Sequence, residues 1–396
     1  MKLAVVTPRF GAEVVGGAET AARLLATALV RHLGWDVEIL TTTAIDTNWN
    51  DGFDPGTTAL DDLVVRRFPV RGRRTDRFDD LSSRIFPAPR RATHADEVAW
   101  VDAQGPVSDE LIDAIASTDA DVVAFHPYLY HPTIVGRAAA KVPTMLHGAA
   151  HDEPPLQLGI IRQLFESVDG HAFWSDAERS VASRFAIGSI PQAVIGLGVE
   201  TQPGTVDAAR LAVGLDDRPY VVCLGRVDDG KGAALLARLF AEYADRNDDD
   251  VVLVFVGPVV DPPPQHPRVV VAGRVDESVK WGLLRGAIAL VSPSAYESFG
   301  IVLGEAWLAG RPVLVNERCA VTRDHVGASG GGLTFTNGAT FASALHRLIH
   351  DPAVANALGA AGQAYAGERF TWERTVERYR RLVDAVRRRA ADHLIE

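Results

Sequence analysis

Two carboxylates and two cations lie beside glycine-rich segments in the second half of the chain. Glu297 and Glu305 are eight residues apart in ESFGIVLGE, and Arg226 and Lys231 are five residues apart in GRVDDGKG. At a helical rise of ~1.5 Å per residue, the carboxylates are at most about 12 Å apart. That spacing suits gripping two ends of an extended ligand, and the cations suit a diphosphate. The residues therefore predict a binding site for a phosphorylated ligand.

Both motifs follow apolar runs that predict buried strands. YVVCLG (220–225) precedes Arg226, and AIALVSPS (287–294) precedes Glu297, after which a helix is expected to begin near Gly300. Ligands of open α/β sheets bind at the carboxyl ends of strands, and helix N-termini bind anions. A ligand site is therefore favoured over an exposed basic turn, although GRVDDGKG is not a P-loop.

The first half of the chain offers a second glycine turn and two histidines. Gly16 and Gly17 stand between a predicted strand and a predicted helix over 18–33. Glycine there would let the backbone approach a phosphate, but a plain strand-to-helix turn fits equally well. His126 and His147 each directly follow a predicted strand, so both could meet a substrate at one sheet edge. A structural role for each histidine is the alternative.

Strand and helix patterns alternate along the chain, which predicts an α/β fold with doubly wound parallel sheets. The length of 396 residues exceeds what one hydrophobic core usually supports. The predicted parts are a first domain over 1–196, a Gly/Pro/Thr-rich linker and hinge over 197–205, a second domain over 206–370 and a long amphipathic helix over 371–396.

Composition excludes several classes of protein. A net charge of −11 argues against nucleic-acid binding, and no apolar run is long enough for a transmembrane helix. The N-terminus lacks the apolar region of a signal peptide. Cys223 and Cys319 have no metal-ligand spacing, so no metal site is expected. These features together predict a cytoplasmic location.

Residues 66–91 contain nine arginines and three prolines, which predicts mostly loop or short helices. The stretch could attract an anionic lipid headgroup or a phosphorylated acceptor, and a solvated insertion is the alternative. Four apolar residues alternate with the arginines and extend the prediction to peripheral contact with the inner membrane face: Phe68, Phe78, Ile85 and Phe86.

Three motifs in order, GGAE (16–19), GRVDDGKG (225–232) and E-x7-E (297–305), resemble those of retaining glycosyltransferases of family 4. The resemblance implies the GT-B architecture of two Rossmann-like domains facing a cleft. It further implies transfer of a sugar from a nucleoside-diphosphate sugar, UDP before GDP, to a glycan or lipid-linked acceptor. Neither a metal nor another cofactor is expected, and attack is expected on the front face of the sugar.

The resemblance also implies roles for individual residues. Arg226 and Lys231 would bind the diphosphate, Glu297 the transferred sugar and Glu305 the ribose. His126 would touch the sugar or acceptor and joins Glu297, Arg226 and Lys231 as a predicted catalytic residue. Further contacts are predicted for Gly16 and Gly17 with the diphosphate, for the backbone N–H groups of Phe299, Gly300, Ile301 and Val302 with sugar and phosphate, for Val275 with the base, and for His147 on the acceptor side.

Two other functions fit parts of the pattern. A sugar-nucleotide epimerase or hydrolase of the same architecture would bind a similar donor, but E-x7-E fits transfer better. A non-catalytic nucleotide-sugar-binding protein would not need all four charged residues of the two motifs.

Overall fold

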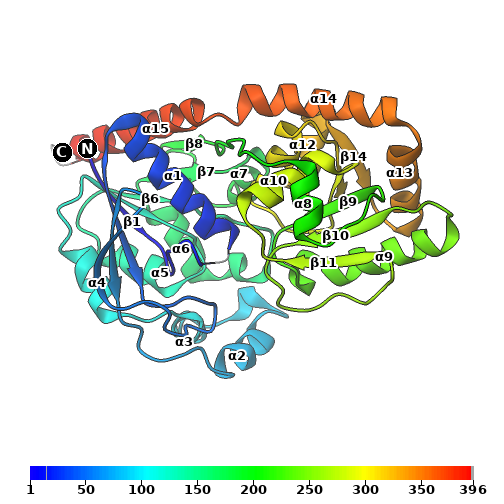
Figure 1. Cartoon of the computed structure of the whole chain (residues 1–396). Helices are drawn as coiled ribbons and strands as arrows, with labels where there is room; N and C mark the ends of the chain where they lie inside the picture. Colours follow the sequence, from blue (N-terminus) through cyan, green and yellow to red (C-terminus); the bar gives the residue numbers. More distant parts are fainter. Residues whose placement is uncertain (15, 394–396) are drawn as a thin grey trace. The chain divides into compact units, whose positions relative to one another are not determined.

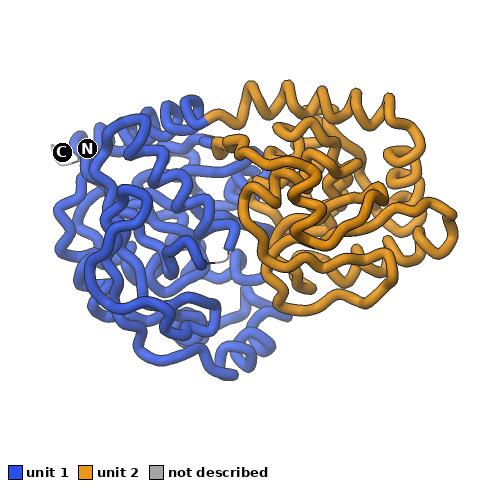
Figure 2. The backbone as a smooth tube through the Cα atoms, in the orientation of Figure 1, with its two compact units in different colours: residues 1–196, 372–396 blue, residues 197–371 orange. Residues whose placement is uncertain are grey.

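The computed structural model describes residues 1–14 and 16–393, which fall into two compact units (Figures 1 and 2). Unit 1 comprises residues 1–196 and 372–396, and unit 2 comprises residues 197–371. The last residues of the predicted C-terminal helix, 394–396, lie outside the described residues. None of the described helices combines the length and apolar character needed to cross a membrane.

The described part of unit 1 contains an eight-stranded sheet of order β3-β4-β2-β1-β5-β6-β7-β8. Its strands are β1 (Lys2–Val6), β2 (Asp36–Thr42), β3 (Gly56–Leu60), β4 (Leu63–Phe68), β5 (Val122–Phe125), β6 (Thr144–Leu146), β7 (Gly170–Phe173) and β8 (Gln192–Val194). All pairings are parallel except that of β3 with β4. The parallel pairing brings the carboxyl ends of β5 and β6, and hence His126 and His147, to one edge of the sheet.

The helices of unit 1 cover both faces of this sheet. They are α1 (Gly17–Leu33), α2 (Arg77–Ile85), η1 (Pro89–Arg91), α3 (His94–Gln104), α4 (Asp109–Ala116), α5 (His131–Ala139), η2 (Pro154–Gln157), α6 (Gly159–Ser167), α7 (Asp176–Ala182) and α15 (Trp372–His393). The last helix, α15, packs on α1, β7 and β8. Its predicted apolar stripe is buried: Trp372, Val376, Tyr379, Leu382, Val383 and Val386.

Residues 66–91 contain the predicted short helices, but they begin in a strand. Arg66 and Arg67 lie in β4, and only the part after Phe68 forms turns and the short helices α2 and η1. Arg67 is buried because its guanidinium donates to the Phe10 carbonyl at 3.0 Å and covers the ring of Phe53. A guanidinium that finds an acceptor and an aromatic face can occupy an inward position of a strand.

The described part of unit 2 holds a six-stranded parallel sheet of order β11-β10-β9-β12-β13-β14. Its strands are β9 (Tyr220–Leu224), β10 (Val252–Val256), β11 (Val269–Gly273), β12 (Leu290–Ser292), β13 (Val313–Asn316) and β14 (Gly332–Phe335). Its helices are α8 (Val206–Ala212), η3 (Asp229–Lys231), α9 (Ala233–Arg246), α10 (Glu277–Gly286), α11 (Ile301–Leu308), α12 (Ala320–Ser329), α13 (Gly338–His350) and α14 (Pro352–Arg369). The two sheets with helices on both faces confirm the predicted α/β class.

The segment 197–205, predicted as a linker, is attached to unit 2. Arg285 of α10 donates to the carbonyls of Gln202 at 2.6 Å and Gly204 at 3.0 Å. The backbone N–H of Val199 donates to the Phe370 carbonyl at 2.9 Å, just before the chain enters α15. The chain passes between the two units twice, after residue 196 and after residue 371, and these bonds lie within a few residues of each passage.

Candidate functional site

The turn after β9 is held by one aspartate that sequence reasoning did not single out. The Asp228 carboxylate accepts the backbone N–H of Lys231 at 2.7 Å and caps the short helix η3. Its other oxygen accepts the Nε–H of Arg226. One carboxylate thus fixes both the backbone that carries Lys231 and the guanidinium of Arg226. Its position three residues before Lys231 is the usual spacing of a helix N-cap, so the sequence did contain the signal.

Gly232 closes this turn against the second motif. Its φ of 79° is left-handed, and an added Cβ would lie 3.2 Å from Cβ of Pro293. Pro293 directly follows β12, and its carbonyl accepts the side-chain N–H of Asn316 at 2.9 Å. A glycine that is both left-handed and closely packed lets the β9 turn reach the β12 loop.

The β12 loop presents Glu297 and ends at α11. Gly300 caps that helix with a φ of 78°, and Phe299 is buried against Phe370 with ring centroids 4.8 Å apart. Ile301 and Val302 begin the helix and are partly exposed. The first N–H groups of a helix have no acceptor within it, so this end of α11 can donate to an anion.

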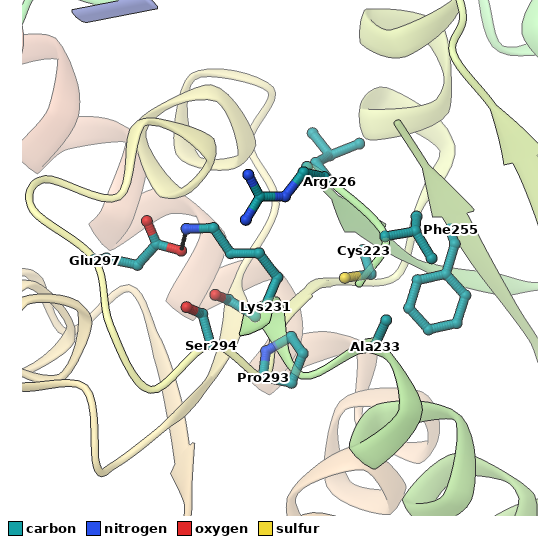
Figure 3. Close-up of a pocket in the computed structure, with 12 residues that line it drawn as sticks. Cys223, Arg226, Lys231, Ala233, Phe255, Pro293, Ser294 and Glu297 are labelled. Atoms are coloured by element: carbon teal, nitrogen blue, oxygen red, sulfur yellow. Dashed lines mark hydrogen bonds and ion pairs between the residues drawn. The ribbon is translucent and has the colours of Figure 1, made fainter. Parts of the chain in front are cut away.

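The turn and the loop form a pocket in unit 2 (Figure 3). Its polar lining includes Arg226, Lys231, Ser294 and Glu297. The ammonium of Lys231 lies 2.7 Å from the Glu297 carboxylate, and both side chains keep partial exposure, 35% and 19%. The two motifs, 66 residues apart in sequence, therefore meet as one charged site.

Cys223 also lines the pocket. Burial, together with the charge of Glu297, raises the pKa of this thiol to about 12, although Lys231 acts in the opposite direction. The thiol is therefore protonated at neutral pH and is not an activated nucleophile.

Glu305 does not touch this pair but has a cation of its own. Its carboxylate lies 2.6 Å from the ammonium of Lys280 on α10, and Lys280 also contacts Glu277 at 2.8 Å. Burial raises the pKa of Glu305 above its ordinary value, and the charge of Lys280 opposes that effect. Lys280 was missed because it belongs to no motif and lies 25 residues before Glu305. Val275, also predicted to line the site, is half-buried just before α10.

Residues 218–351 match the family model of the group 1 glycosyl transferases. The chain is 30% identical over 260 residues to a D-inositol 3-phosphate glycosyltransferase of Kribbella flavida, across 57% of this chain and 58% of the relative. It is 27% identical over 332 residues to an alpha-maltose-1-phosphate synthase of Mycobacterium tuberculosis, across 71% of this chain and 84% of the relative. The chain is thus similar to the group 1 glycosyl transferases, with the family-model match lying within residues 218–351. It spans less than two thirds of the first of these relatives.

Solved structures of other proteins share the fold of this chain. The sucrose-phosphate synthase of Thermosynechococcus elongatus superposes with a TM-score of 0.69 at 21% identity, covering 97% of this chain and 99% of that one. HepE of Anabaena, in complex with UDP and glucose, superposes with a TM-score of 0.67 at 17% identity, covering 100% and 99%. The predicted GT-B fold is therefore confirmed.

The glycine turn of unit 1 lies at the start of α1. Gly16 is extended at φ 170° and caps the helix, and an added Cβ would lie 2.0 Å from Glu19 Oε2. Glu19 forms a buried ion pair with Arg9. Gly16 thus has a packing reason to be glycine, whereas no atom of the described residues lies within 4 Å of a Cβ on Gly17. Contact of either glycine with a diphosphate stays a prediction, because both lie in unit 1 and the pocket lies in unit 2.

The two predicted histidines of unit 1 meet at the sheet edge. The rings of His126 and His147 stack with centroids 3.8 Å apart, and both are nearly inaccessible. His147 Nε2 lies 3.1 Å from the hydroxyl of Tyr379 on α15, so this ring has a structural partner. Within the part of the chain that the structure describes, the ring of His126 has no hydrogen-bond partner, which leaves it the better candidate of the two for contact with a substrate.

Acid should destabilise unit 1 through its buried histidines. Burial lowers the pKa of His126 to about 3, that of His171 to about 4, and that of His147 well below its ordinary value. The unfolded chain takes up protons near pH 6.5 and the folded chain does not, so stability falls as pH falls through 6.5. At pH 5 each histidine costs roughly 2 kcal/mol of unfolding free energy. Glu178 opposes this, because burial raises its pKa to about 7.

Three histidines outweigh one glutamate, so the unfolding temperature measured by calorimetry should be lower at pH 5 than at pH 7.5. The variant Glu178→Gln removes the opposing proton uptake and should steepen the fall. An unfolding temperature that is flat or rises on acidification would contradict the buried, neutral state of these rings.

The arginine-rich stretch 66–91 turns its apolar side chains inward. Phe78 and Phe86 pack on the ring of Trp100 at 6.0 and 5.6 Å, and Ile85 is buried. Phe68 packs on the same core cluster. These four side chains fill unit 1, which gives their alternation with arginine a folding reason.

Proposed function

We propose that this protein transfers a sugar from a nucleoside-diphosphate sugar to an acceptor hydroxyl, with retention of the anomeric configuration. The observation that carries the proposal is the pocket in which Arg226, Lys231 and Glu297 converge, with Lys231 2.7 Å from Glu297. A pair of cations and an adjacent carboxylate is what a sugar diphosphate needs, because the cations match the phosphates and the carboxylate matches sugar hydroxyls.

The chemistry follows from where charge develops. Breaking the bond between the anomeric carbon and the phosphate oxygen leaves negative charge on the diphosphate. Lys231 and Arg226 stabilise that charge, and the start of α11 adds backbone N–H donors. When Lys231 turns from Glu297 to the diphosphate, the carboxylate becomes available to accept hydrogen bonds from the sugar. In front-face attack, the leaving phosphate oxygen takes the acceptor proton, so no protein base is required.

The identity of donor and acceptor extends the proposal. UDP is the favoured nucleotide of the donor, since HepE was crystallised with UDP and glucose. The names of the inositol-phosphate and maltose-phosphate relatives point to phosphorylated sugars among acceptors or products. The exposed arginines of 66–91, such as Arg71 and Arg73, suit an anionic acceptor, including a lipid-linked glycan at a membrane surface. Because the apolar side chains of this stretch pack inside unit 1, contact with a membrane surface would depend on the charge of the arginines alone.

Transfer is proposed to need no metal, since Arg226 and Lys231 already supply positive charge at the diphosphate. Activity should therefore persist in excess EDTA. Loss of activity in EDTA that returns with Mg²⁺ would contradict this part of the proposal.

The deciding experiment is a thermal-shift screen with UDP, GDP, ADP and their glucose or mannose conjugates, followed by product analysis. We expect one nucleoside diphosphate to raise the unfolding temperature and its sugar conjugate to be consumed only with an acceptor. Rapid conversion of the donor alone to an epimer would favour the epimerase alternative. Binding without any turnover across an acceptor panel would favour a non-catalytic binding protein.

A further inference from the structure

One carboxylate and two imidazoles gather where α9, α13 and the loop before β10 meet. Asp249 lies in that loop, and His346 and His350 lie one helical turn apart near the end of α13. One ligand atom from each lies within 4.8 Å of the others. The contact between Asp249 Oδ1 and His350 Nε2 is 2.7 Å, and the two imidazole rings are 4.1 Å apart.

Hydrogen bonds from two neighbouring side chains fix the position of Asp249. Tyr243, a buried residue of α9, donates its hydroxyl to the other oxygen of Asp249 and lies 3.4 Å from Nδ1 of His346. Arg268 donates to the backbone carbonyl of Asp249. Hydrogen bonds of this kind orient the ligands of metal sites and keep them in place before the ion arrives.

We propose that Asp249, His346 and His350 bind one divalent transition-metal ion of the Zn²⁺ type. Imidazole nitrogen and carboxylate oxygen are ordinary zinc ligands at about 2.0–2.2 Å, and three of them leave a fourth position for water. Two imidazoles favour Zn²⁺, Ni²⁺ or Cu²⁺ over Mg²⁺ or Ca²⁺, which prefer all-oxygen sites. Small side-chain rotations suffice, because the ligand atoms already lie close together.

The ion would not take part in sugar transfer. Asp249 precedes β10, whereas Arg226 follows β9, and these neighbouring strands are parallel. The cluster therefore lies at the amino edge of the unit 2 sheet, and the pocket lies at the carboxyl edge. The ion would join α13 to the loop before β10 and stabilise unit 2. This proposal is independent of the proposed function, and it departs from the sequence analysis, which expected no metal site.

Calorimetric titration of the EDTA-treated, dialysed full chain with ZnCl₂ tests the site. We expect one strong binding event per chain and an unfolding temperature that rises with Zn²⁺ concentration, since an ion that binds only the folded state stabilises it. The double variant His346→Gln/His350→Gln should bind at least tenfold more weakly. The variant His32→Gln, which removes an exposed histidine of unit 1, is the matched control and should bind as the parent does.

Cobalt gives a second readout that does not depend on the stability of a variant. Co²⁺ bound to the parent chain should show visible absorption bands without the near-ultraviolet band of a thiolate ligand, because neither Cys223 nor Cys319 belongs to the cluster. No saturable Zn²⁺ binding, unchanged binding in the double variant, or a thiolate band with Co²⁺ would each overturn the proposal. The first of these would leave the three residues as a hydrogen-bonded cluster only.

Discussion

Replacing Lys231 by methionine is expected to lower turnover by about 10²–10³-fold, the usual cost of losing one donor aimed at developing charge. Methionine keeps the length and apolar stem of the side chain, so the pocket wall beside Pro293 should persist. Stability should change little, because the Lys231 side chain is 35% exposed and such ion pairs contribute weakly to folding. Steady-state kinetics with the donor from the thermal-shift screen would measure the loss.

The control is Lys141→Met, which removes an exposed ammonium in unit 1 and should leave turnover unchanged. A second comparison separates the two roles open to Lys231. If the lysine only orients Glu297, then adding Glu297→Gln to Lys231→Met should cost nothing further. If it stabilises the leaving diphosphate, the double variant should lose more than either single one. Normal turnover by Lys231→Met would remove the diphosphate assignment.

The sequence predicted those parts of the site that one local pattern encodes. Apolar runs identified β9 and β12, and the glycine at Gly300 marked the start of α11. The contact between Lys231 and Glu297 was not predicted, because it depends on β9 and β12 being neighbours in the sheet. Strand order is set by the packing of the whole unit, and the resemblance only placed both residues on one donor.

Two misreadings have a common physical cause. The stretch 66–91 was predicted as loop or short helices because of its prolines, yet its first residues end a strand, where Arg67 satisfies its guanidinium on Phe10 and Phe53, which are distant in sequence. Lys280 was overlooked for the same reason, since only the fold brings α10 beside Glu305. Contacts between residues that are far apart in sequence produce no local periodicity or spacing from which they could be predicted.

The second large expected effect is weaker nucleotide binding when Glu305 or its partner Lys280 is replaced. Glu305→Gln should weaken binding of the nucleoside diphosphate by about 1–3 kcal/mol, because an amide replaces the carboxylate predicted to hold the ribose hydroxyls. Lys280→Met should weaken it too, but by another route. Without the ammonium at 2.6 Å, burial raises the pKa of Glu305 further, and the protonated acid is a poorer acceptor.

The two variants should therefore differ in how affinity depends on pH. A carboxyl group ionises as pH rises through its pKa, so Lys280→Met should regain affinity as the pH is raised, whereas Glu305→Gln should not. Calorimetric titration with UDP at several pH values measures this, and the double variant should match Glu305→Gln alone. Lost affinity in Lys280→Met that fails to recover at high pH would mean that Lys280 contacts the nucleotide itself. Undiminished affinity in Glu305→Gln would instead remove Glu305 from the ribose site, because a buried carboxylate that accepts hydroxyl donors cannot be replaced by an amide without loss.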